Sequence, residues 1–132
     1  MMSGDLPTDW RNLREFAAVD LSRSFVLSWD VESGVLLIDV DLLLTPEHPF
    51  YETPRPKEKV CIRPAVIEFP FCQRIASDGN PAETKPAAAV KKLKTGAITG
   101  LRRVNDGRYE INGAFGAVLI EAERPILRLK GP

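Results

Sequence analysis

Two aspartates and one histidine are the residues in this chain whose types and spacing best suit chemistry. Asp39 and Asp41 lie two residues apart in the apolar stretch 35–44. In a β-strand they project from the same face, with Cα atoms roughly 6.5–7 Å apart. His48 follows shortly after and is the only histidine. Paired carboxylates near an imidazole suit a divalent cation or acid–base catalysis.

The same three residues also have an ordinary explanation. Charges on a long apolar strand oppose aggregation, and a histidine between Glu47 and Pro49 in a polar loop needs no functional role. Two interpretations therefore stay open. One is a small enzyme or metal-binding protein that uses Asp39, Asp41 and His48. The other is a solvent-facing strip beside an exposed loop.

The loop over 45–58 carries side chains that are typical of recognition surfaces. Its four prolines exclude a helix and remove sheet donors. Phe50, Tyr51 and Arg55 are binding candidates, since aromatic and arginine side chains on a stiffened loop lose little entropy on binding. Such a loop can equally fold back and cover the end of a β-sandwich.

Basic residues gather in one later part of the chain. They are Lys91, Lys92, Lys94, Arg102, Arg103 and Arg108. A basic hairpin could contact phosphates. However, 18 Lys and Arg balance 18 Asp and Glu over the whole chain, and stacking aromatic residues are lacking near this segment. The sequence argues against nucleic acid as a partner.

Motifs of the common enzyme classes are missing. The chain has no glycine-rich phosphate loop, no Gly-x-Ser-x-Gly, no His-Glu-x-x-His and no Cys-x-x-Cys. We expect no cofactor, and we expect Cys61 and Cys72 to be buried free thiols. These absences leave the question of enzymatic activity undecided and favour a non-enzymatic binding module.

A protein is the partner that such a module would bind. A second copy of the chain is one version, because the apolar residues Val35, Leu37 and Leu43 share the face of the two aspartates, and exposed apolar strips tend to be covered. The N-terminal residues lack the pattern of a secretory signal, and no apolar run approaches the roughly 20 residues that span a bilayer. We therefore expect a cytoplasmic protein without a membrane partner.

A β-hairpin must position the two aspartates. Alternation over 24–31 predicts a strand with Phe25, Leu27, Trp29 and Val31 toward the core. In the strand 35–44, the core side takes Leu36, Ile38, Val40, Leu42 and Leu44. A turn with an even number of residues is expected, because an odd one would set Leu27 opposite Asp39. The expected pairs are Trp29 with Leu36, Leu27 with Ile38, and Phe25 with Val40.

Further elements complete the expected fold. Trp10, Leu13 and Phe16 predict a short helix over 9–18. A second hairpin turns at 105–107 and pairs Leu101 with Ile111 and Arg102 with Glu110. The segment 76–94 is expected to be a flexible loop, with a helical turn available over 87–93.

These elements predict the class of fold. Several short strands joined by turns indicate a mainly β protein, an antiparallel β-sandwich or open barrel of about seven strands with one short N-terminal helix. A chain of 132 residues is the usual size of one domain, so we expect a single domain over 1–132.

Overall fold

The computed structural model describes residues 7–54, 56–57, 59–77 and 85–130. Nine strands occur in these ranges: Thr8–Asp9 (β1), Val19–Glu32 (β2), Val35–Leu44 (β3), Cys61–Phe69 (β4), Arg74–Ser77 (β5), Gly96–Asn105 (β6), Arg108–Gly113 (β7), Gly116–Glu121 (β8) and Ile126–Leu129 (β9). They form one antiparallel sheet in the order β5-β8-β7-β6-β2-β3-β4-β9, with β1 paired to β6. The prediction of a mainly β sandwich or open barrel is confirmed.

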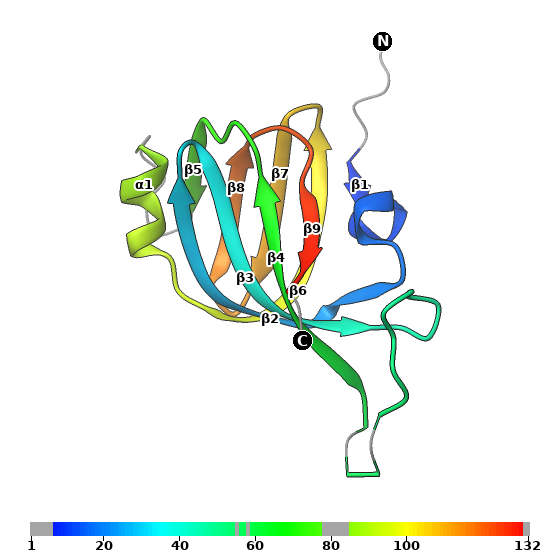
Figure 1. Cartoon of the computed structure of the whole chain (residues 1–132). Helices are drawn as coiled ribbons and strands as arrows, with labels where there is room; N and C mark the ends of the chain where they lie inside the picture. The colour runs from blue at the N-terminus through cyan, green and yellow to red at the C-terminus, as the bar shows by residue number, and fades with distance from the viewer. Residues whose placement is uncertain (1–6, 55, 58, 78–84, 131–132) are drawn as a thin grey trace.

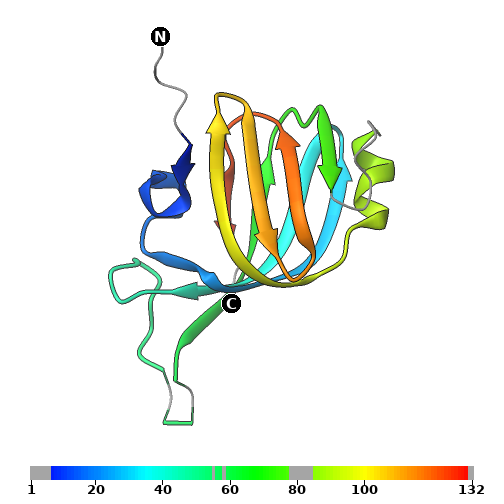
Figure 2. The ribbon, with the colours of Figure 1, turned by 180° about the vertical axis from the view of Figure 1, so that it is seen from behind.

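The sheet curls around one core without closing its hydrogen-bonded order (Figures 1 and 2). Strand β5 lies at one end of that order and β9 at the other. The connection from β4 to β5 and the connection from β8 to β9 therefore each cross between the two ends of the sheet. The two crossings are hydrogen-bonded to each other, since Gln73 N donates to Glu121 O at 2.8 Å and Glu123 N donates to Pro70 O at 2.9 Å. An open barrel results.

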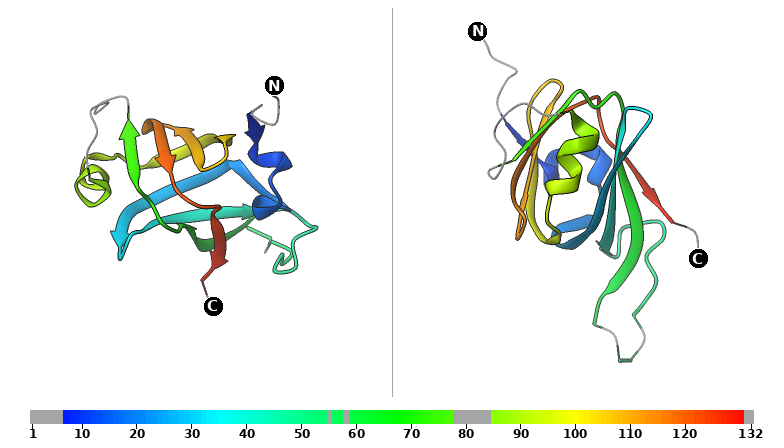
Figure 3. Two further views of the ribbon diagram at one scale, coloured as in Figure 1. Left: turned by 90° about the horizontal axis from the view of Figure 1, so that it is seen from above. Right: turned by 90° about the vertical axis from the view of Figure 1, so that its left-hand side faces the viewer.

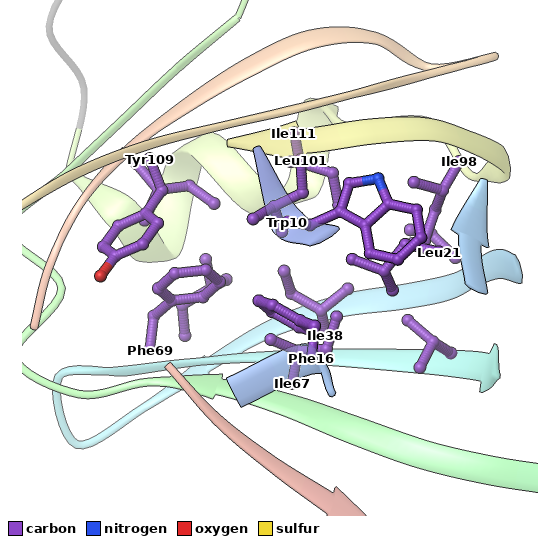
Figure 4. Packing of buried hydrophobic residues seen from close by; sticks show 14 of the residues in the cluster. Trp10, Phe16, Leu21, Ile38, Ile67, Phe69, Ile98, Leu101, Tyr109 and Ile111 are labelled. Carbon is purple, nitrogen blue, oxygen red and sulfur yellow. The ribbon is translucent and has the colours of Figure 1, made fainter. Parts of the chain in front are cut away.

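The core is made of alternate residues from the long strands. On β3, the predicted inward residues are all buried: Leu36, Ile38, Val40, Leu42 and Leu44. Figure 4 shows Ile38 and Ile67 among the large side chains that fill the barrel. Phe69 and Tyr109 meet edge to face with ring centroids 5.2 Å apart. The inward face of β3 thus fixes the other face, with both aspartates, outside the barrel.

The pairing of β2 with β3 corrects the predicted register. The two-residue turn Ser33-Gly34 confirms an even-numbered loop, and both residues have the positive φ that such turns favour. The pairs lie two residues from those predicted, with Trp29 opposite Ile38.

A bulge in β2 then reverses which residues face the core. The register shifts between Val26 and Ser28, and one extra residue changes the alternation of sides. Val26 is therefore buried, whereas Phe25 and Leu27 are 49% and 50% exposed. The prediction that Phe25 and Leu27 face the core is wrong, and so is the pairing of Phe25 with Val40, because Phe25 lies opposite Asp41.

The predicted short helix over 9–18 is not one continuous helix. Two 3₁₀ turns replace it, Trp10–Asn12 and Arg14–Phe16, and Asp9 caps the first by accepting from Arg11 N at 3.1 Å. Trp10, Leu13 and Phe16 are nevertheless buried, as expected. Their spacing of three residues matches the three residues per turn of a 3₁₀-helix better than an α-helix.

The second hairpin has the predicted register. Leu101 lies opposite Ile111 and Arg102 lies opposite Glu110, and Gly107 has φ +82° in the turn. Arg102 Nε contacts Glu110 Oε1 at 3.0 Å across the two strands. Here the turn residues and the cross-strand charges specify the same register.

The segment predicted to be flexible has regular structure at both ends. Strand β5 includes residues 76–77, and the helical turns Pro86–Ala89 (α1) and Val90–Lys92 follow later. Residues 78–84 lie outside the described residues. None of the helices in the described part of the chain has the length and apolar character needed to cross a membrane.

The two cysteines are free and buried, as expected. Burial raises the pKa of the Cys72 thiol to about 11. Since the thiolate is the reactive form, Cys72 is an inert core residue at neutral pH.

Candidate functional site

Asp39 lies on the outside of the barrel, where both of its carboxylate oxygens have partners. Oδ1 is 2.6 Å from Lys130 Nζ, and Oδ2 accepts a hydrogen bond from Ser28 Oγ at 2.9 Å. The bond to Lys130 is the main cause of the lowered pKa of Asp39, and Ser28 contributes although partial burial opposes the shift. Asp39 on β3 thus connects to Ser28 on β2 and to Lys130, which follows β9, and it stays ionised.

Asp41, two residues further on β3, is placed differently. Its backbone pairs with Phe25 on β2 and with Pro64 on β4. Its half-buried side chain makes no hydrogen bond or ion pair with another described residue. Asp41 is therefore available to a partner in a way that Asp39 is not.

His48 is bound within its own loop. Its Nδ1 accepts a hydrogen bond from Phe50 N at 3.0 Å, and its ring lies 5.8 Å from the Phe50 ring. Burial lowers the pKa of His48, and an accepting Nδ1 also requires the neutral ring. No group of three or more His, Cys, Asp and Glu in the described ranges could hold a metal ion. The structure therefore does not assemble Asp39, Asp41 and His48 as a metal site.

The described part of the loop after β3 lies at the end of the barrel opposite the β2–β3 turn (Figures 1 and 3). Tyr51 packs against the core, whereas Phe50 is 58% exposed. Arg63 of β4 contacts the loop twice, donating to Phe50 O at 3.5 Å and approaching Glu52 at 3.6 Å. Arg55 lies outside the described residues. The loop thus folds back on the sheet through Tyr51 and presents Phe50.

The largest exposed apolar side chains near the aspartates come from the neighbouring strands. Phe25, Leu27 and Ile62 are 49%, 50% and 48% exposed. Phe25 lies directly opposite Asp41, and Ile62 lies opposite Leu43 on the same side of the sheet. We call Phe25, Leu27, Asp41 and Ile62 the β2–β4 face.

The strip expected from the sequence is less exposed than this face. Val35 and Leu37 are already half-buried, and Leu43 is buried with 7% of its surface exposed. Sequence reasoning missed Phe25 and Leu27 as surface residues because the β2 bulge reverses their side. The sequence did contain one signal of this reversal. Val26 lies between Phe25 and Leu27 and is apolar too, so the alternation alone does not decide whether Val26 or its two neighbours face the core.

The opposite wall of the barrel carries its own exposed leucine. Leu119 on β8 is 47% exposed. Arg74 and Glu121 form an ion pair across β5 and β8 at 3.3 Å beside it. A cavity of about 210 Å³ lies there, lined partly by Arg74, Arg108 and Leu119, and Arg74 Nε is buried without a hydrogen-bond partner among the described residues.

No family model matches the chain, and neither a curated protein nor a solved structure matches it. The physical arrangement of the residues is therefore the basis for a function.

Proposed function

We propose that this protein is a non-enzymatic interaction module that associates with a second copy of itself through the β2–β4 face. The observation that carries the proposal is the exposure of three apolar side chains, Phe25, Leu27 and Ile62, on the side of the sheet that carries Asp41, which has no partner among the described residues. Removing such side chains from water is the main favourable term in association.

The charges beside this face support a second copy as the occupant. Arg23, which is exposed, lies two residues before Phe25 and makes no hydrogen bond or ion pair with another described residue. Arg23 beside the face and Asp41 on it are thus a cation and an anion without a partner in the described ranges. A two-fold axis brings the same patch of both copies together, so Arg23 of each copy can approach Asp41 of the other. Lys130 already neutralises Asp39, which removes a source of repulsion between copies.

The cellular location is part of the same proposal. Cys61 and Cys72 are free thiols in the structure. Free thiols suit a reducing compartment, so we keep the cytoplasm as the proposed location.

Sedimentation velocity over a range of concentrations tests the proposed function. We expect a reversible monomer–dimer equilibrium. Ile62→Lys should weaken it at least about tenfold, because a buried lysine would lose its hydration without gaining a partner. Leu119→Lys is the matched control, since Leu119 is 47% exposed on another strand and Ile62 is 48% exposed. A protein that stays monomeric at millimolar concentration, or equal weakening by both variants, would contradict the proposal.

A further inference from the structure

A cavity of about 340 Å³ lies at the end of the barrel where the connections between strands meet. The β6–β7 turn supplies Asp106 and Gly107, the β4–β5 crossing supplies Phe71, and the β8–β9 crossing supplies Glu123. Figure 1 shows these three connections together at the top of the molecule, and Figure 2 shows the same arrangement from behind. The cavity is distinct from the β2–β4 face.

Tyr109, a buried residue, is part of the lining of this cavity. Its side chain is 2% exposed, and its hydroxyl makes no hydrogen bond with another described residue. Figure 4 shows the hydroxyl oxygen directed away from the packed Leu101 and Ile111. Tyr109 lines the cavity together with Asp106 and Arg124, and both of these charged groups act on its hydroxyl. Burial raises the pKa of Tyr109, which keeps the group protonated at neutral pH.

The charge around the cavity is negative once its ion pairs are counted. Arg124 is paired with Glu15 at 3.7 Å, outside the cavity lining. Asp106 and Glu123 are exposed, and their carboxylates contact no basic group among the described residues. Two carboxylates are thus left without a counter-charge beside the Tyr109 hydroxyl.

The carboxylate of Glu121 also lines the cavity, but it is already engaged. Its Oε2 lies 3.3 Å from Arg74 Nη1. Glu121 therefore adds no further uncompensated charge, and Asp106 and Glu123 remain the two groups that attract a cation.

Phe71 adds an aromatic surface at the cavity rim. Its ring is 73% exposed, the largest exposure among the exposed large apolar side chains of the described residues. Its φ of +51° lies in the left-handed region, which a bulky residue rarely adopts. The face of an aromatic ring attracts cations, and carboxylates and a hydroxyl oxygen accept N–H bonds.

We propose that this cavity binds a cationic nitrogen group, an alkylammonium or an alkylguanidinium. Asp106 and Glu123 supply the counter-charge, the Tyr109 hydroxyl oxygen accepts an N–H bond, and the Phe71 ring covers the cation. Either a lysine or arginine side chain of another protein or a free small amine carries this chemistry.

An NMR titration with simple cations tests the proposal on the intact chain. The probes are butylammonium and butylguanidinium chloride, with butanol at matched ionic strength as the neutral control. We expect saturable shifts of the Tyr109 and Phe71 ring signals with the cations and none with butanol. Acetylated tripeptides with a central lysine, arginine or alanine form the second arm. Tighter binding of the lysine or arginine peptide than of the free cation identifies a protein side chain as the source, and the reverse identifies a small amine.

Substitutions then test the assigned residues. Asp106→Asn and Glu123→Gln should each weaken binding about two- to fivefold, the usual range for an exposed charge pair, and together they should weaken it about four- to twenty-five-fold. Glu52→Gln, an exposed carboxylate in the loop at the other end of the barrel, is the control and should change nothing. Tyr109→Phe should weaken guanidinium binding while leaving the fold intact, because the hydroxyl makes no hydrogen bond within the described part of the chain. Cations that bind the double variant as well as the wild type, or no saturable shift at millimolar concentration, would overturn the proposal.

Discussion

The two walls of the barrel differ in how their exposed apolar side chains are surrounded. On β8, Leu119 is 47% exposed and sits near the ion pair of Arg74 with Glu121. On the β2–β4 face, Phe25 and Ile62 are exposed to the same degree, and the nearest carboxylate, Asp41, has no partner among the described residues.

This difference bears on how well each wall suits contact with a partner. Paired charges next to a single leucine keep a sheet surface in water. A partner bound there would remove water from the ion pairs, and this desolvation costs more free energy than the weak attraction within the pairs returns. Several apolar side chains beside an unpaired charge of each sign leave a surface that a partner can both cover and neutralise. This is why we propose the β2–β4 face as the interaction surface, although single residues on the two walls are equally exposed.

The largest effects should come from the core that both walls share. Ile38 on β3 and Ile120 on β8 are fully buried behind the two walls. Replacing either with alanine should lower the free energy of unfolding by about 2–5 kcal/mol, through lost burial and a residual cavity. Urea unfolding followed by circular dichroism measures it. A second transition in only one variant would show that the walls belong to separate cooperative units.

The next largest effect concerns self-association. Phe25→Lys should raise the dimer dissociation constant at least about tenfold, because the charge would be buried against a second copy. Light scattering across a dilution series measures this. Equal dissociation constants for Phe25→Lys and Leu119→Lys would remove the distinction between the walls.

A smaller effect is expected at Asp39. The bond to Lys130 is the main cause of the lowered pKa of Asp39. The ionised carboxylate therefore stabilises the fold at every pH above the one at which an ordinary aspartate titrates. This stabilisation should be lost as the pH falls below about 4. Because Lys130 is half exposed, Asp39→Asn should cost at most about 1 kcal/mol at neutral pH and nothing at low pH. Thermal unfolding across pH measures it, and a cost independent of pH would contradict the assignment.

The smallest effect should follow from breaking a pair on the other wall. Arg102 and Glu110 are joined at 3.0 Å, but the Arg102 side chain is 47% exposed. Arg102→Ala should therefore change the free energy of unfolding by only about 0.2–1 kcal/mol and should leave self-association unchanged. Stronger dimerisation of Arg102→Ala would show that this wall also takes part.

Local signals in the sequence were enough to predict the second hairpin. Gly107 permits the positive φ of the turn, and the opposite charges of Arg102 and Glu110 support the same register as the pairing of Leu101 with Ile111. Turn chemistry and cross-strand contacts act over a few residues, so alternation and residue type suffice there.

The first hairpin shows where such reasoning stops. The inward face of β3 was predicted correctly because its alternation is unbroken. The side of Phe25 was not, because a bulge inserts one residue and its position depends on packing across the barrel. Ser24 illustrates this dependence: it is buried, and its hydroxyl both donates to Asp20 O and accepts from Leu43 N.

The candidate sites were predicted only in part for the same reason. Asp41 was identified from its place on β3, but the ion pair of Asp39 with Lys130 joins residues far apart in the sequence. Tyr109 and Phe71 gave no local signal, because the cavity forms only where three separate connections meet.

The location of the contact between two copies is the central claim, and backbone amide NMR at low and high protein concentration tests it most directly. We predict that the amide shifts of Phe25, Asp41 and Ile62 change with concentration, while those of Leu119 and Glu110 stay constant. Concentration-dependent shifts at Leu119 with constant shifts at Phe25 and Ile62 would contradict it.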